Sequence, residues 1–191
     1  MARGNHKSYR MPLNYSIPRA ILDILLDVSE HSGVFDTPYQ RMKRSWRKLQ
    51  GAPEPTMVRY NRAIKYLQAR KELRVRKAGD RIFLKLTKKG KLKALLLRLY
   101  RDFDKKVEWD GKWRLVMWDI PESSSHERDK IRNLLKDLEF YQLQKSVFIS
   151  PRALPNSAVE FLKESELMKY IRFLRVDKME NDRFFRRHFQ L

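Results

Sequence analysis

The hydrophobic period of the sequence changes after Leu73, and this change constrains the fold more than any other feature. Before that point apolar residues recur every three or four positions, as expected of amphipathic helices. After it the period is two over residues 74–77 and 81–86, which is typical of strands. The turn Ala78-Gly79-Asp80 lies between these two stretches. The order therefore predicts several helices followed by a β-hairpin.

Three helix-start signals divide the stretch before Leu73. Ser16 can cap a first helix that ends at Gly33, and its apolar stripe consists of Ile21, Ile24, Leu25 and Val28. Thr37 begins a T-x-x-Q capping box for a short basic helix whose buried stripe would be Met42, Trp46 and Leu49. Thr56 caps a third helix, and its inward residues are expected to be Met57, Tyr60, Ile64 and Leu67. These signals predict three short helices before the hairpin.

The hairpin is followed by the run Leu86-Thr87-Lys88-Lys89-Gly90, which ends a strand and caps a further helix. A strand that ends in Leu-Thr-x-x-Gly before a helix resembles the winged helix-turn-helix transcription regulators of prokaryotes. The resemblance covers about residues 16–104. It implies that the third helix enters the major groove of DNA and that the hairpin is the wing.

The positive charge of the chain is concentrated in the same region. The whole sequence has 43 basic and 23 acidic side chains, for a net charge of +20. Residues 1–106 have 27 basic and 9 acidic side chains, whereas residues 107–191 have 16 and 14. Such a field attracts polyanions, so nucleic acid is the expected partner. The alternative of an anionic membrane surface is disfavoured, because this half shows turns, caps and a strand hairpin rather than one amphipathic helix with Trp or Phe on its apolar face.

The candidate DNA-contacting residues follow from groove chemistry. Arginine can bind guanine O6 and N7, and asparagine can bind adenine N6 and N7, in the major groove. On the third helix the candidates are Arg59, Asn61, Arg62 and Lys65. On the hairpin they are Arg76, Lys77 and Arg81, which would contact phosphates or a narrow minor groove. The alternative is that the helix residues form an ordinary solvated face, and RNA is a further alternative to DNA.

The second half alternates strands and helices. Residues 114–120 are predicted to form a continuous buried strand, and Ser124 with Glu127 forms an S-x-x-E capping box for the next helix. A strand over residues 141–150, a helix from Asn156 and a strand over residues 168–176 follow. This order predicts a split βαβ, ferredoxin-like sheet with two helices. One of its four strands is indistinct, unless residues 139–150 contain two short ones.

Two runs in this half, Trp113-Arg-Leu-Val-Met-Trp-Asp-Ile-Pro-Glu122 and Gln144-Lys-Ser-Val-Phe-Ile-Ser-Pro151, resemble two related families. One is the phenylacetate-catabolon repressor (PaaX) family, and the other is the CRISPR-associated Cas-two family. With a winged helix placed before it, the layout resembles PaaX. The resemblance implies a homodimeric transcription regulator, with repression as the expected mode. PaaX proteins continue into a further region, whereas this chain stops at Leu191, so a coenzyme A thioester site is not carried over.

Asp119 occupies the position of the aspartate with which Cas-two proteins and their symmetry mates hold a divalent ion. The resemblance therefore leaves open a metal-dependent nuclease or spacer-acquisition role, with Mg²⁺ as the ion and Asp119 as ligand and catalytic residue. The alternative, which we favour, is a strand-end aspartate that accepts N–H groups from the turn before the Ser124 helix. The sequence has no cysteine, and its histidines are too scattered to form a metal cluster.

The sequence thus predicts an α+β protein in which a winged helix-turn-helix is joined by a helix to a ferredoxin-like domain. The expected parts are a basic arm over residues 1–15, a DNA-binding domain over 16–104, a linker over 105–112 and a dimerisation domain over 113–191. We expect double-stranded DNA and a second copy of the chain as partners. We expect no cofactor, no membrane contact and a cytoplasmic location, and we leave a small-molecule effector open. Packing of Phe184, Phe185 and Phe189 against the domain is favoured over contact with a partner.

Overall fold

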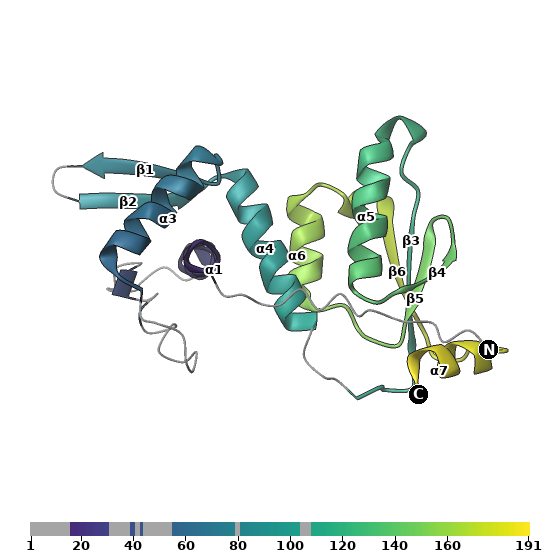
Figure 1. The fold of residues 1–191 in the computed structure, drawn as a ribbon. Helices are drawn as coiled ribbons and strands as arrows, with labels where there is room; N and C mark the ends of the chain where they lie inside the picture. Colours follow the sequence, from purple (N-terminus) through teal and green to yellow (C-terminus); the bar gives the residue numbers. More distant parts are fainter. Residues whose placement is uncertain (1–15, 31–38, 41–42, 44–54, 79–80, 104–107) are drawn as a thin grey trace, which may run out of the picture. The chain divides into compact units, whose positions relative to one another are not determined.

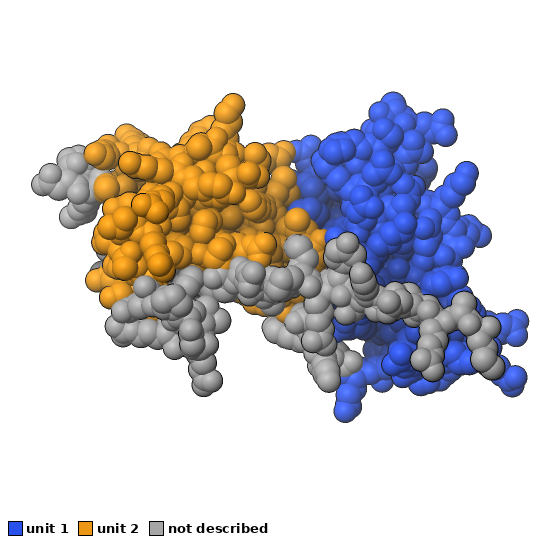
Figure 2. All heavy atoms as spheres, viewed as in Figure 1, with its two compact units in different colours: residues 1–13, 103–191 blue, residues 14–102 orange. Residues whose placement is uncertain are grey.

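The computed structural model describes residues 16–30, 39–40, 43, 55–78, 81–103 and 108–191. The described residues divide into two compact units, one within residues 14–102 and one within residues 103–191 (Figure 2). We call them the N-terminal unit and the C-terminal unit. Each contains helices and an antiparallel sheet, which confirms the prediction of a mixed α and β fold (Figure 1). Among the described residues, no helix combines the length and the apolar composition needed to cross a bilayer.

The first helix, α1 (Ile17–Glu30), is buried on more than the single stripe that its sequence period predicts. The buried side chains are those of Ala20, Ile21, Leu22, Ile24, Leu25 and Leu26. α1 contacts α3 and β2, and Asp23 and Asp27 form ion pairs with Arg101 (2.6 Å) and Arg98 (2.5 Å) of α4. A helix enclosed by three neighbours has no wide solvent face, so a single stripe underestimates its core.

The helix expected after Thr37 falls mostly outside the described residues, including its expected stripe. Tyr39, Gln40 and Lys43 are helical. The Tyr39 ring packs edge-on against the Tyr60 ring, with 5.1 Å between ring centroids. The Tyr39 hydroxyl donates a hydrogen bond to the Pro55 carbonyl (3.2 Å), next to the start of α3.

Helix α3 (Met57–Ala69) begins at the expected cap, because the Arg59 N–H donates to Thr56 Oγ1 (3.3 Å). Tyr60 and Leu67 are buried as predicted, and burial raises the pKa of Tyr60 to about 12. Met57 was expected to point inward but is half exposed, and this prediction is wrong. Met57 is the first residue of the helix and lies beyond the end of the core.

An antiparallel hairpin follows, made of β1 (Leu73–Ala78) and β2 (Arg81–Leu86), and then α4 (Lys88–Phe103). The connection from α3 to β1 is a tight turn without glycine. Lys71 has a positive φ of 57°, its N–H donates to the Gln68 carbonyl, and the Glu72 N–H donates to the Leu67 carbonyl. These two bonds satisfy the last carbonyls of α3 and make a Schellman motif. The turn places Glu72 directly before the first strand of the hairpin.

The Glu72 side chain is fully buried and ion-paired on two sides. Its Oε1 accepts from Arg70 Nε (2.9 Å) and from Lys93 Nζ of α4 (3.0 Å), and its Oε2 accepts from Lys93 Nζ (3.2 Å). Burial alone would raise the pKa of Glu72, but the hydrogen bonds and charges of Arg70 and Lys93 outweigh it and hold that pKa below its ordinary value. The carboxylate therefore joins the end of α3 to the first turns of α4.

The run from Thr87 to Gly90 completes this junction. Thr87 Oγ1 donates to the Lys71 carbonyl (2.7 Å) and accepts from the Gly90 N–H (3.0 Å), as the cap of α4. A Cβ atom at Gly90 would lie 1.9 Å from the Glu72 carbonyl oxygen, so no larger residue fits. The Thr-x-x-Gly part of the pattern is thus explained by the Thr87 cap and by one close contact between α4 and the turn before β1.

The C-terminal unit has a four-stranded antiparallel sheet in the order β4-β5-β3-β6 (Figure 1). Its elements are β3 (Trp113–Trp118), η1 (Glu122–Ser124), α5 (Ser125–Asp137), β4 (Tyr141–Gln144), β5 (Val147–Ser150), α6 (Asn156–Glu164), η2 (Met168–Tyr170), β6 (Ile171–Val176) and α7 (Arg183–Phe189). The β-α-β-β-α-β sequence and this strand order are those of a ferredoxin-like sheet. Residues 139–150 do contain two short strands, which supply the fourth strand.

Three local expectations for this unit are wrong. The strand expected over residues 168–176 begins only at Ile171, because residues 168–170 form the 3₁₀ turn η2. β3 ends at Trp118, two residues earlier than expected. Ser124 forms no side-chain cap for α5, because the 3₁₀ turn η1 already precedes the helix. The Ser124 N–H donates to the Pro121 carbonyl within that turn (2.9 Å).

Helix α7 packs its aromatic rings on the sheet near the start of β3. The Trp113 ring, whose side chain is fully buried, lies 6.0 Å from Phe185 and 5.9 Å from Phe189 between centroids. The expected packing is therefore confirmed for these two rings, whereas Phe184 touches Tyr141 (5.4 Å) and stays half exposed. α5 and α6 cover the other face of the sheet (Figure 1).

The Glu72 junction predicts a pH dependence of stability. Because the pKa of Glu72 is lower in the folded protein, its ionised form stabilises the N-terminal unit above the ordinary pKa of 4.5, and this stabilisation is lost as pH falls through the lower folded value. Glu72→Gln should reduce the free energy of unfolding by roughly 1–3 kcal/mol near neutral pH. Acidification should then destabilise the variant less than the wild-type protein.

The measurement is calorimetric unfolding of both proteins from about pH 7 to about pH 3. Glu160→Gln, which changes an exposed glutamate of α6, is the matched control and should leave the N-terminal transition unchanged. An identical pH dependence for Glu72→Gln and the wild-type protein would contradict the ion-paired junction.

Candidate nucleic-acid interface

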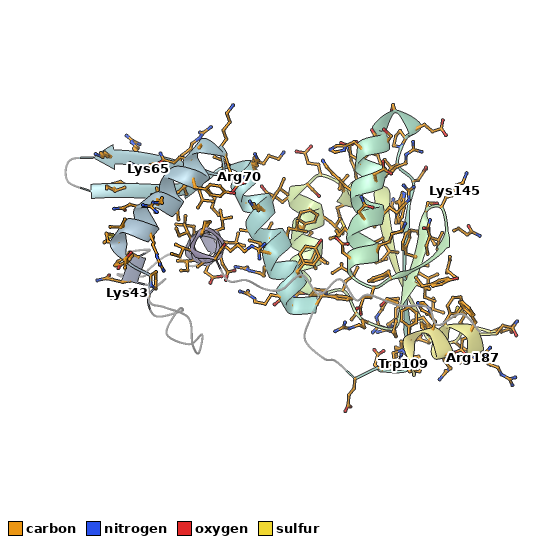
Figure 3. All side chains as sticks on the ribbon, in the orientation of Figure 1. Lys43, Lys65, Arg70, Trp109, Lys145 and Arg187 are labelled. Atoms are coloured by element: carbon orange, nitrogen blue, oxygen red, sulfur yellow. The ribbon has the colours of Figure 1, made fainter. Side chains whose placement is uncertain are left out.

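One face of α3 presents to solvent a continuous stripe of one apolar, one polar and two basic side chains. Tyr60, Ala63 and Leu67 face the core, so residues on the opposite side must point outward. The outward side chains at the spacing i, i+3, i+4, i+7 are Val58, Asn61, Arg62 and Lys65, and all are exposed. Figure 3 shows Lys65 on this helix and Arg70 just beyond its end. Three of the four predicted reading residues therefore lie together.

The fourth predicted residue, Arg59, is also exposed but lies on the flank of the stripe. It precedes Arg62 by three positions, which is about 60° around a helix, on the side nearer the core. Arg59, Arg62 and Lys65 form no ion pair with any described residue, unlike the paired Arg98 and Arg101 of α4. Their charges are therefore available to an anionic partner.

Val58 belongs to the same stripe, and the sequence reasoning passed over it. Its exposed fraction is 65%, and it precedes Asn61 by one turn. The spacing i, i+3 was readable in the sequence, but valine is normally assigned to a core. An apolar side chain on a groove-facing stripe is suited to the C5-methyl group of thymine.

The hairpin has two different faces, which its register defines. Leu73, Val75, Leu84 and Leu86 alternate on the face that continues into the core. The opposite face carries the cross-strand pairs Arg74–Lys85 and Arg76–Phe83, all exposed, and we call it the cationic face. The sequence reasoning missed Arg74 and Lys85, because face membership depends on the register.

The predicted hairpin residues are divided between these faces. Arg76 lies on the cationic face, whereas Lys77 pairs across the strands with Ile82 on the other face. Both are exposed. Arg81 begins β2, but its side chain lies outside the part of the molecule that the structure describes. The structure therefore places Arg76 with Arg74 and Lys85 rather than with Lys77.

Asp119 lies immediately after β3 and is exposed. Its N–H donates to the Tyr170 carbonyl (3.0 Å). Its carboxylate accepts no hydrogen bond from another described residue, so the contact expected with the turn before α5 is not found there. The described residues contain no group of three or more His, Cys, Asp or Glu side chains able to hold a metal ion. A metal at Asp119 would therefore need ligands from elsewhere, such as a second copy.

Residues 106–184 match the family model described as the PaaX protein central Cas2-like domain. The match spans β3 to the first turn of α7, which is the whole ferredoxin-like sheet. It confirms the resemblance of the C-terminal unit to PaaX proteins. Comparison with curated proteins and with solved structures finds no match to the chain.

Proposed function

We propose that this chain, which contains a PaaX central Cas2-like domain over residues 106–184, is a cytoplasmic transcription regulator that binds double-stranded DNA as a homodimer. In this proposal the N-terminal unit is a winged helix-turn-helix and the C-terminal unit pairs the subunits. Repression is the mode that the family resemblance favours.

The observation that carries the proposal is the stripe of α3 next to the basic hairpin. An exposed helix face with an asparagine, an arginine and a lysine matches the donors and acceptors of base edges in the major groove. α3 contacts β1, so the hairpin lies beside the stripe as a wing lies beside a recognition helix. A solvated helix face would explain both the exposure and the lack of carboxylate partners, but it would not explain why Asn61, Arg62 and Lys65 share one face in a unit that also contains a basic hairpin.

Salt dependence distinguishes phosphate contacts from base contacts. Each phosphate neutralised releases counterions, so the slope of log affinity against log salt is about −0.9 per contact on duplex DNA. We expect roughly five to eight contacts per dimer and a loss of ~10³ or more in affinity between about 50 and about 200 mM salt. Arg76→Ala with Lys77→Ala should flatten this slope with little change in sequence preference, because phosphates carry no base identity.

Arg62→Ala and Asn61→Ala should instead relax preference at one or two base pairs, at a cost of ~1–3 kcal/mol on the cognate site. The measurement is a salt titration on a duplex selected from a random pool and on its scrambled counterpart. Lys163→Ala, which removes an exposed cation of α6, is the matched control and should change neither quantity. Equal losses on both duplexes for Arg62→Ala and Asn61→Ala would show that α3 is not the reading helix.

The edge strand β6 is the surface that we assign to subunit pairing. β6 pairs with β3 along one edge and ends the sheet. Phe173 and Leu174 are 38% and 40% exposed and point to opposite faces of this strand. An edge strand has unpaired backbone groups that can pair with a second strand, and two exposed apolar side chains add area to such a contact. Two-fold pairing would place two reading helices on successive grooves, ~34 Å apart or a multiple of it.

Size-exclusion chromatography with light scattering tests the pairing. The wild-type protein should have the mass of a dimer. Phe173→Glu with Leu174→Glu should raise the dimer dissociation constant by ~30-fold or more, because a charge would be buried without a partner. Lys163→Glu, at an exposed position of α6, is the matched control, and this variant should remain dimeric. A wild-type protein that stays monomeric alone and with DNA would remove the two-fold arrangement.

Asp119 carries the second candidate function, a metal-dependent nuclease. Its exposed carboxylate at the end of β3 is a hard oxygen ligand suited to Mg²⁺, and dimerisation could bring two copies together. We expect no cleavage when the protein is incubated with single-stranded RNA or duplex DNA plus Mg²⁺ or Mn²⁺. Cleavage by the wild-type protein that Asp119→Asn abolishes would favour the nuclease over the regulator.

A further inference from the structure

Two large apolar side chains are exposed near the tip of the hairpin, and the proposed function uses neither. Ile82 is 62% exposed and Phe83 is 52% exposed. They point to opposite faces, since neighbouring residues of a strand alternate. Ile82 lies on the face that continues into the core, opposite Lys77. Phe83 lies on the cationic face, opposite Arg76.

Phe83 is the only apolar member of the two cross-strand pairs that define the cationic face. Arg74, Arg76 and Lys85 surround it, and all three are exposed. None of these three cations forms an ion pair with a described residue. A partner that covers this face must offer a flat apolar surface between anionic groups. A polynucleotide has this combination, because its bases are flat and apolar and its phosphates flank them.

The position of the hairpin beside α3 favours duplex DNA over other polynucleotides. The proposed reading stripe on α3 requires a duplex, and the hairpin lies beside α3. Apolar side chains such as phenylalanine enter DNA as wedges from the minor groove and partly unstack a base step, while neighbouring cations contact the backbone. The position of Phe83 near the tip, with Arg76 directly opposite, suits such an entry.

We propose that Phe83 is a wedge that enters the minor groove of duplex DNA and partly unstacks one base step, with Arg76 on the adjacent phosphate. This inference rests on the proposed function, because it requires that the N-terminal unit binds duplex DNA. It adds a deformation of the DNA to the contacts already assigned. Sequence preference at the wedged step would then come from how easily that step unstacks rather than from hydrogen bonds.

The test compares two duplexes of about 30 base pairs that differ only in one central mismatched pair. A mismatch already weakens stacking, so the free-energy cost of inserting a side chain between the bases is lower there. We expect the wild-type protein to bind the mismatched duplex roughly 5- to 10-fold more tightly than the perfect one. Phe83→Ala should bind both duplexes equally.

Two matched variants separate the wedge from general binding. Ile82→Ala truncates another exposed apolar residue, on the other face, and should keep the preference for the mismatch. Arg76→Ala should weaken binding to both duplexes by the same factor, because it removes a phosphate contact. A second measurement uses 2-aminopurine beside the mismatch position in the perfect duplex, whose fluorescence rises on unstacking. Saturating wild-type protein should raise it, and saturating Phe83→Ala should not.

The outcomes distinguish the two proposals. If the wild-type protein binds neither duplex, both the proposed function and this inference fail. If it binds both duplexes, and Phe83→Ala keeps the wild-type ratio and fluorescence, only the wedge fails. Tighter binding of the single strand of the same sequence than of either duplex, lost in Phe83→Ala, would also overturn the wedge and assign the cationic face to unpaired bases. Because Phe83 is exposed, Phe83→Ala should keep the wild-type melting temperature, which calorimetry checks.

Discussion

A single buried carboxylate, that of Glu72, determines how the parts of the N-terminal unit are joined. The end of α3, the first residues of β1 and the first turns of α4 meet at this residue through the Arg70 and Lys93 ion pairs. Burying a charge is costly unless it is paired and hydrogen-bonded, and here both oxygens accept from cations. The backbone of the same residue accepts from Thr87 and touches Gly90. The ionised carboxylate therefore links the end of α3 to α4 at the residue directly before the hairpin.

Much of the fold could be predicted from the sequence, because strands and helix starts leave local signals. The change of period at Leu73 gave the hairpin, and Thr56 gave the cap of α3. Helix ends were less predictable. Two residues after α3, α5 and α6 end, the chain has positive φ angles at Lys71, Glu139 and Glu166, although none of these is glycine. Backbone hydrogen bonds at each end hold these residues in that conformation. The residue types at these positions therefore do not indicate in the sequence where the helix ends.

The candidate interface could be predicted only in part, and for a different reason. Helical spacing alone places Asn61, Arg62 and Lys65 on one side, because Tyr60 and Leu67 are recognisable as core residues. On a hairpin the faces are known only once the register and the core face are known. The alternating period of residues 81–86 therefore does not show that Phe83 shares a face with Arg76. Its surface position is a tertiary fact that the alternating pattern does not contain.

Most of helix α7 lies outside the stretch that matches the family model, although its rings complete the packing of the sheet. The stretch similar to PaaX proteins ends at residue 184, in the first turn of α7. The rings that cover Trp113, those of Phe185 and Phe189, lie just beyond that limit, as does Arg186, whose guanidinium stacks 4.7 Å from the Trp109 ring. A fragment cut at the limit of similarity would leave the largest buried side chain of the sheet uncovered. The smallest fragment that can fold on its own is therefore longer than the stretch that matches the family model.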